Sequence, residues 1–218
     1  MARIPKPKRH YNASRRQAQA AETRRLIVTS AQELFAAKGY AGTTIQAIAA
    51  GAGVAPETVY ATFGSKRAIL TRWLELAVGG DERPLPVLER DQPQSVRRDR
   101  DQRRQIRGFA KGMRQILERV GPVFDVMHVA AKSEPEIAAL LQNTLNERLA
   151  NLGQVVDWLA RNGPLRKGLD STTAPESVWA FTSAEVHRLL TIERGWSGDQ
   201  YERWLGDVLE AYLLPPPR

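Results

Sequence analysis

Apolar side chains recur along this chain at steps of three and four residues, the spacing that gathers them on one face of an α-helix. In the first third of the sequence the pattern predicts four helices, separated by glycines. The first runs from about residue 17 to Gly39, the second begins at a Thr-Thr-Ile-Gln capping box, the third begins at Pro56, and the fourth is capped by Ser65 and ends near Val78. In the capping box we expect Thr43 to be the N-cap and Gln46 to reach back to it.

The pattern stops between residues 79 and 100, where two glycines, three prolines and a charged run suggest a connecting segment. Helical spacing then resumes and continues to the end of the chain, and no stretch alternates with the period of a β-strand. We therefore predict an all-α protein of about nine helices. Its expected parts are a flexible basic arm (1–16), a helix-turn-helix domain (17–78) and a C-terminal domain (79–218).

Charge changes this picture at one end of the chain only. The 218 residues carry a net charge of +8, and eight cations facing a single acid within residues 1–25 account for +7 of it. Such a segment suits a polyanion, nucleic acid before an anionic membrane, although a solubilising tail is the plain alternative. There is no cysteine, no run of apolar residues long enough to span a membrane, and no apolar stretch after the basic N-terminus, so we expect a cytoplasmic protein without disulfides.

The third predicted helix has unusual chemistry for its length. Val54, Val59 and Phe63 are large enough to dock it on its neighbours, whereas the positions between them are small or polar. Two short helices joined by a glycine turn, the second presenting small groups, form the motif that enters the DNA major groove. Glu57 either accepts from a cytosine amino group or is simply a first-turn acid favoured by the helix dipole. Tyr60 is either a core edge or a phosphate donor.

At this point a family resemblance is apparent. The segment from residue 22 to 76 is similar to the DNA-binding domain of the tetracycline-repressor (TetR) family of bacterial transcription regulators. The matching signature begins with an aromatic-Gly-Tyr stretch from Phe35 to Tyr40, followed by a Thr-Thr-Ile sequence. It continues with Ile-Ala at 48–49, Ala-Gly-Val at 52–54 and Val59-Tyr-x-x-Phe-x-Ser-Lys66. It departs from the family in having Ala55 where a capping serine is common, and Thr62 where a histidine is common.

The resemblance implies roles for the matching positions. Residues similar to the family's phosphate-contacting positions are Thr43 or Thr44, Tyr60, Thr62 and Lys66. Residues similar to its base-reading positions are Ala55, Pro56, Glu57, Thr58 and Ala61. We add a minor-groove arm as a hypothesis of our own, made of Arg3, Lys6, Lys8, Arg9, Arg15 and Arg16.

The resemblance also implies a homodimer on a near-palindromic operator, acting as a repressor that is released by a small effector. The last two helices carry wide apolar stripes, which favour a dimer interface of Trp179, Val186, Leu190, Trp204, Leu205, Val208 and Tyr212, although the same stripes could fill the monomer's own core. An apolar or aromatic effector is expected among Phe109, Met113, Phe124, Met127, His128, Trp158, Trp179 and Phe181, with His187 also considered.

Other functions remain as alternatives. A constitutive DNA-binding dimer would keep the fold without an inducer. An enzyme is the weaker alternative, because no Ser-His-Asp grouping, HExxH motif or phosphate-binding loop is present. No cofactor and no metal site are predicted.

Overall fold

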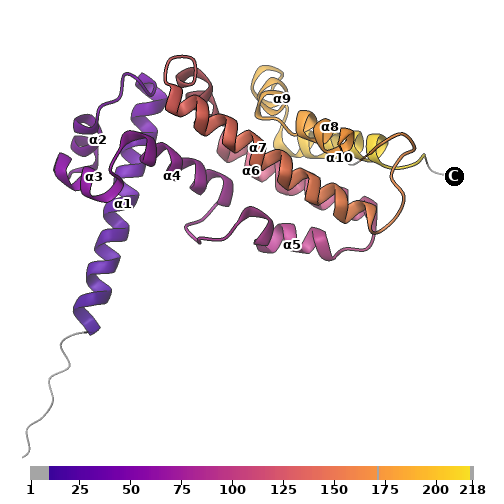
Figure 1. The fold of residues 1–218 in the computed structure, drawn as a ribbon, viewed down its shortest axis with the longest axis horizontal. Helices are drawn as coiled ribbons and strands as arrows, with labels where there is room; N and C mark the ends of the chain where they lie inside the picture. Colours follow the sequence, from indigo (N-terminus) through magenta and orange to yellow (C-terminus); the bar gives the residue numbers. More distant parts are fainter. Residues whose placement is uncertain (1–9, 171, 217–218) are drawn as a thin grey trace, which may run out of the picture. The chain divides into compact units, whose positions relative to one another are not determined.

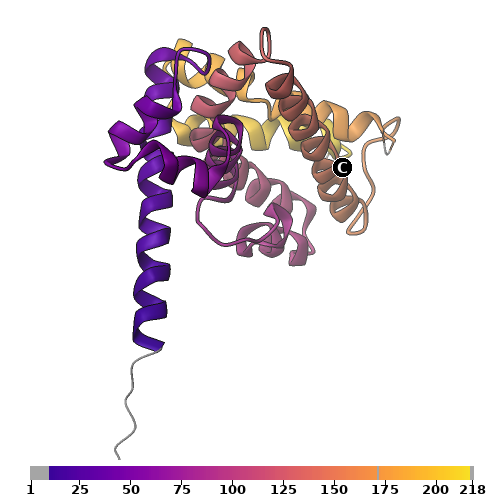
Figure 2. The ribbon, with the colours of Figure 1, turned by 60° about the vertical axis from the view of Figure 1, so that its left-hand side comes forward.

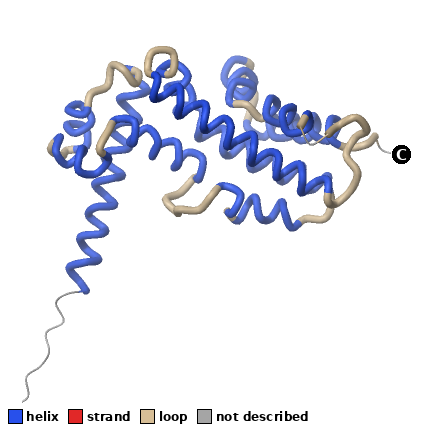
Figure 3. The backbone as a smooth tube through the Cα atoms, in the orientation of Figure 1, coloured by secondary structure: helices blue, strands red, loops and turns tan. Residues whose placement is uncertain are grey.

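The computed structural model describes residues 10–170 and 172–216. Its contacts divide the chain into two compact units, Met1–Trp73 and Leu74–Arg218. All regular structure in the described residues is helical, as predicted, and Figure 3 shows helices joined by short loops. The boundary between the units lies inside a helix, at a position where sequence spacing gives no signal.

Unit 1 is built on one long helix, α1 (His10–Lys38), with α2 (Ile45–Ala52), α3 (Pro56–Phe63) and the start of α4 (Lys66–Gly79) beside it (Figure 1). Its core is aromatic at the centre, where Phe35 stacks on Tyr40 at 5.5 Å and on Trp73 at 6.3 Å between ring centroids. Ile27 and Ile48 are fully buried and join α1 to α2. Residues 10–16, predicted to be flexible, belong to α1. The good helix formers arginine, glutamine and alanine fill every position from Arg15 to Ala21.

Unit 2 contains the rest of α4, the short helix η1 (Val87–Glu89), α5 (Asp91–Arg98), α6 (Gln102–Ala130) and α7 (Pro135–Ala160). These are followed by α8 (Thr173–Phe181), α9 (Ala184–Arg188), the π-helical turn η2 (Leu189–Glu193) and α10 (Gly198–Leu213). The predicted connecting segment 79–100 is therefore partly helical. α6 is one continuous helix, and Pro122 lies inside it without ending it.

The longest packing in unit 2 joins α6 to α10. Arginines on α6 meet acids on α10 in reverse order: Arg103 bonds Glu210 at 2.8 Å, Arg107 bonds Asp207 at 2.7 Å, and Arg114 bonds Asp199 at 2.8 Å. The two helices are therefore antiparallel. Gly206 lies beside Arg107, and a methyl group there would lie 2.7 Å from the Arg107 guanidinium, which would have to shift.

Candidate nucleic-acid interface and ligand cavity

The turn between α2 and α3 forms as the sequence predicts. Gly53 ends α2 in the left-handed conformation (φ 66°), and its amide donates to the carbonyls of Ala49 and Ala50. Pro56 is in the first turn of α3, and the N-cap Ala55 makes no side-chain bond. α3 therefore begins on backbone geometry alone, which leaves its first turn of amides uncovered by any capping side chain.

The cap of α2 differs from the prediction. Thr44 is the N-cap, and its hydroxyl accepts from the amide of Ala47 at 3.1 Å. Thr43 is buried and donates to the carbonyl of Gly39 at 2.8 Å, which closes the loop after α1. Because Ala47 has no side chain that can return to the cap, the capping box with Gln46 does not form. Thr43 is consequently turned into the protein, and only Thr44 is exposed.

Lys66 has a structural task that the sequence did not reveal. Its ammonium donates to the carbonyls of Tyr40 at 2.7 Å and Thr43 at 3.1 Å, and lies 4.1 Å from the centroid of the Tyr40 ring. Two of its three protons are thus used inside unit 1. Lys66 ties the start of α4 to the loop that leads into α2, and its contact with phosphate stays a prediction.

The outward face of α3 combines short side chains with longer ones that are exposed. Ala55, Glu57, Tyr60 and Ala61 are exposed, and Tyr60 retains 51% of its accessible surface. Pro56, Thr58 and Thr62 are half-buried, and the Thr62 hydroxyl donates to the carbonyl of Thr58 at 2.6 Å. Docking rests mainly on Val59, which is fully buried, whereas Val54 and Phe63 are half-buried. The exposed side of α3 therefore presents two alanine methyl groups beside the longer side chains of Glu57 and Tyr60.

The predicted basic arm divides into two parts. Arg3, Lys6, Lys8 and Arg9 lie outside the described residues. Arg15 and Arg16 are exposed residues of α1, and here the structure differs from the minor-groove prediction. An α-helix with side chains is about 10–12 Å wide, whereas the minor groove of B-DNA is about 6 Å wide.

The residues predicted to line a ligand pocket differ in burial. Met113, Phe124, Met127 and Trp158 are buried, while Phe109, His128, Trp179 and Phe181 are half-buried. The described residues contain an open cavity of about 360 Å³ in unit 2, and among the predicted residues only Trp158 lines it. Its other lining residues, missed from the sequence, are Pro86, Leu88, Glu89, Gln94, Arg97, Asn151, Gln154, Asp157 and Arg161.

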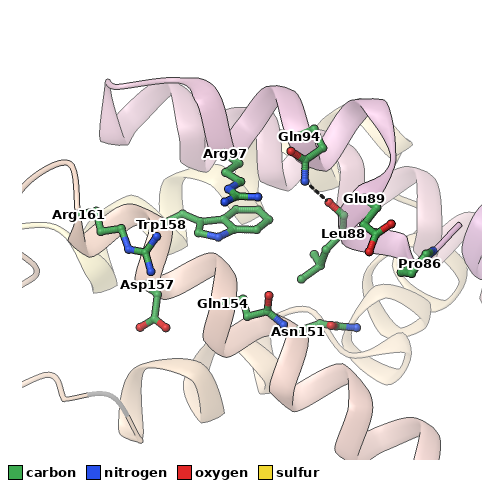
Figure 4. A pocket seen from close by; sticks show the side chains of 10 residues that line it. All are labelled: Pro86, Leu88, Glu89, Gln94, Arg97, Asn151, Gln154, Asp157, Trp158 and Arg161. Carbon is green, nitrogen blue, oxygen red and sulfur yellow. Dashed lines mark hydrogen bonds between the residues drawn. The ribbon is translucent and has the colours of Figure 1, made fainter.

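Figure 4 shows how this cavity is built. η1 and α5 form one wall and α7 the other, with Leu88 pointing from η1 toward Asn151 and Gln154. The Arg97 guanidinium lies 5.8 Å from the centroid of the Trp158 ring, and the Gln94 amide donates to the Leu88 carbonyl at 2.6 Å. The lining of the cavity is therefore one aromatic ring surrounded by amide groups and charges of both signs. The sequence had led us to expect an apolar lining.

The residues predicted for a dimer interface also differ in burial. Leu205 is fully buried in the core of unit 2, so it is not available to a partner, and its place in the prediction is wrong. The others are half-buried, among them Tyr212, which shares a 2.6 Å hydrogen bond with Ser177. The large apolar residues most exposed near them are Ile192 (75%) and Leu189 (47%), both in η2 and both missed from the sequence.

A buried polar cluster lies where α7, α8, α9 and α10 meet. The Arg148 guanidinium donates to the Trp179 carbonyl and to the Thr182 hydroxyl, each at 2.7 Å, and burial lowers its pKa to about 10. The His187 and Tyr201 rings meet edge to face at 4.7 Å. Among the described residues no hydrogen-bond partner reaches the Tyr201 hydroxyl or His187 Nε2. Burial lowers the pKa of His187 and raises that of Tyr201, so both stay neutral near pH 7.

These features define a class of protein: an all-helical protein with a helix-turn-helix formed by α2 and α3. Residues 27–72 match the model of the bacterial regulatory proteins of the tetR family. The TetR resemblance predicted from the sequence is therefore confirmed, and the chain carries the DNA-binding region of that family. No curated protein matches the sequence. In the described residues no helix has the length and apolar character needed to cross a membrane.

Solved structures share the fold along nearly the whole chain. The SmeT–triclosan complex has a TM-score of 0.70 at 19% identity, covering 88% of this chain and 92% of that one. NalD of Pseudomonas aeruginosa, the secondary repressor of the MexAB-OprM multidrug efflux pump, has 0.66 at 19%, covering 90% and 98%. A putative transcriptional regulator of Saccharomonospora viridis in complex with choline has 0.65 at 20%, covering 90% and 100%. At these identities the likeness establishes the shared fold.

Proposed function

We propose that this protein binds operator DNA through α3 and represses transcription until a small effector releases it. The observation that carries the proposal is the exposed face of α3, which combines short side chains with an N-terminus that no side chain caps. Helix N-termini attract phosphate through their unpaired amides and dipole. α3 therefore suits the major groove, which is about 12 Å wide and admits one helix.

Within this site we assign the side chains to two kinds of DNA contact, base edges and phosphates. The N-cap Ala55 and the α3 residues Glu57 and Ala61 are exposed and are assigned to the base edges, where alanine methyl groups can contact thymine methyl groups. Tyr60 and Thr44 are exposed hydroxyls at the borders of the motif and are assigned to phosphates. Lys66 is assigned to hold the loop and, with its third proton, a phosphate.

We propose that two copies bind a twofold-symmetric operator. Recognition helices of such dimers enter successive major grooves about 34–36 Å apart, so that each half-site contacts one copy. The half-buried aromatic residues of α8 and α10, with Leu189 and Ile192 of η2, supply an apolar surface for the partner. An effector then acts by favouring a spacing of the two α3 helices that does not match the grooves.

The effector site that we propose is the cavity beside Trp158. Its volume lies in the range of small-molecule sites, and its lining favours a ligand with one aromatic ring and polar substituents. Structural neighbours bound to triclosan and to choline support effector binding by this fold. We assign no catalytic residue and place the protein in the cytoplasm, with its DNA.

Selection of bound fragments from random duplex DNA tests the DNA-binding function. A twofold-symmetric site, bound more tightly than bulk DNA, is the expected result. Ala61→Asp should abolish specific binding, because it places a carboxylate against the groove. The matched change Ala139→Asp, at an exposed position of α7, should leave specific binding unchanged. Recovery of no preferred sequence would reject the proposal.

A second candidate, a constitutive DNA-binding dimer, is favoured by one observation. Most residues expected to form an apolar pocket do not line the cavity. Thermal shift with small aromatic compounds separates the two functions, because a ligand selective for the native state raises its apparent stability. A Trp158→Ala variant that loses such a shift would locate the effector in this cavity.

A further inference from the structure

The exposed residues near the start of α1 do not contribute to the core of unit 1. α1 is 29 residues long, which corresponds to about 43 Å, and from Arg15 onward its first buried residue is Ile27. Residues 15–22 are all exposed, and Figure 2 shows this end of α1 standing clear of the other helices of unit 1. A helix segment that buries nothing gains little from tertiary packing, so its purpose has to be sought outside the unit.

Its composition excludes two kinds of partner. Residues 12–25 contain no apolar side chain larger than alanine, so the segment offers neither the anchors of a protein interface nor the apolar face of a membrane-surface helix. Arg15 and Arg24 are nine residues apart and therefore point in directions about 180° apart. A flat anionic surface cannot meet both, whereas a grooved polyanion presents charge on both sides of the helix.

Its charges also lack compensation within the protein. Glu22 pairs with Arg25 at 2.9 Å, and in the described part of the chain no ion pair involves Arg15, Arg16 or Arg24. α1 has no acid in its first turn, and the arginines near its start oppose the helix dipole. An anion placed there would relieve both effects.

From this arrangement we infer that the first half of α1 binds, as a helix, the phosphates of DNA flanking the operator half-site, through Arg15, Arg16 and Arg24. The inference rests on the proposed DNA-binding function and adds a second contact region to it. Because the helix is wider than the minor groove, it meets the backbone from outside or at the major groove. These contacts carry no sequence information and add affinity equally to all sites.

The experiment measures operator affinity against salt concentration for the full chain. Arg15→Gln/Arg16→Gln/Arg24→Gln should reduce the slope of log K against log [salt] by about 0.9 per contact, or about 2.7 per bound subunit. The operator preference should not change. The matched control neutralises three exposed cations of unit 2, Arg98→Gln/Lys132→Gln/Lys167→Gln, and should leave the slope as it is.

A second variant tests whether the contact needs a helix. Ala20→Pro breaks α1 ahead of its first core residue, so unit 1 stays folded while the helical content seen by circular dichroism falls. The inference expects Ala20→Pro to lose the slope due to Arg15 and Arg16, and expects added DNA to increase the helicity of the wild type. An unchanged slope in the triple variant, or a full slope in Ala20→Pro, overturns the inference while DNA binding stands. Failure of the wild type to bind any DNA overturns both.

Discussion

Replacing Gly51 by alanine tests the contact that holds the helix-turn-helix against α1. Gly51 lies in the last turn of α2, opposite Ser30 of α1, whose buried hydroxyl donates to the carbonyl of Ile48 at 3.0 Å. A methyl carbon on Gly51 would come closer to the Ser30 hydroxyl than the 3.0 Å that real contacts respect, and would lie 3.3 Å from Ser30 Cβ. α2 approaches α1 this closely only because residue 51 has no side chain.

The expected magnitude follows from three effects. Alanine is favoured over glycine inside a helix by about 0.5–1 kcal/mol, which would stabilise the variant. Against this, turning the Ser30 hydroxyl aside breaks its bond to Ile48 and leaves a buried hydroxyl unsatisfied, at about 1–3 kcal/mol. The remaining 3.3 Å contact adds an overpacking cost toward the low end of about 1–3 kcal/mol. We expect Gly51→Ala to lower the stability of unit 1 by about 1–3 kcal/mol.

A double-variant cycle isolates the contact. Ser30→Ala removes the overlapping atom, so Ser30→Ala/Gly51→Ala should be more stable than Gly51→Ala alone, with a coupling of about 1–2 kcal/mol between the two positions. Hydrogen exchange of the α2 amides in the full chain reports unit 1 separately from unit 2. Operator affinity should fall in Gly51→Ala and recover in the double variant. The reasoning fails if Gly51→Ala is as stable as the wild type, or if Ser30→Ala brings no relief.

Three further predictions concern buried polar groups. Lys66→Met removes the bonds to the Tyr40 and Thr43 carbonyls and should cost about 1–3 kcal/mol in hydrogen-exchange protection of unit 1; no loss would contradict its structural role. Tyr201→Phe removes a hydroxyl without a partner in the described residues, so the melting temperature should stay equal or rise, and a clear drop would mean that the hydroxyl has a partner. His187 has a folded pKa below its unfolded value of about 6.5, so the unfolded state binds its proton more tightly and stability falls as pH drops below about 6.5. His187→Gln should flatten urea-unfolding stability between about pH 5 and 7, and an unchanged profile would show that another group is responsible.

The helix-turn-helix was predictable because its signals are local. Gly53 and Pro56 determine where α2 ends and α3 begins through backbone geometry that needs no distant partner. The assignment of the α2 cap was wrong by one residue because Thr43 and Thr44 are both competent caps. The choice between them depends on Gly39, whose carbonyl accepts from the Thr43 hydroxyl across a loop.

Continuity of helices was harder to predict, because it depends on packing. A proline inside a helix usually ends or kinks it, yet α6 passes through Pro122 with Val120, Val123 and Phe124 buried around it. A proline removes one backbone hydrogen bond, and burial along both sides of the helix exceeds that loss. The extension of α1 to His10 was missed for the opposite reason: composition, not an apolar stripe, sustains it.

The cavity beside Trp158 could not be predicted from the spacing of apolar residues along the sequence. Asn151, Gln154, Asp157 and Arg161 recur on α7 at steps of three and four, which in sequence is the pattern of a solvent-facing side. Only the placement of η1 and α5, some sixty residues earlier, turns that side into a wall and sets Arg97 over Trp158. α3 is formed by eight consecutive residues, whereas a cavity of this kind exists only where distant polar faces meet. Searching such chains for apolar residues therefore finds the core first, and the ligand has to be sought where polar helix faces are covered.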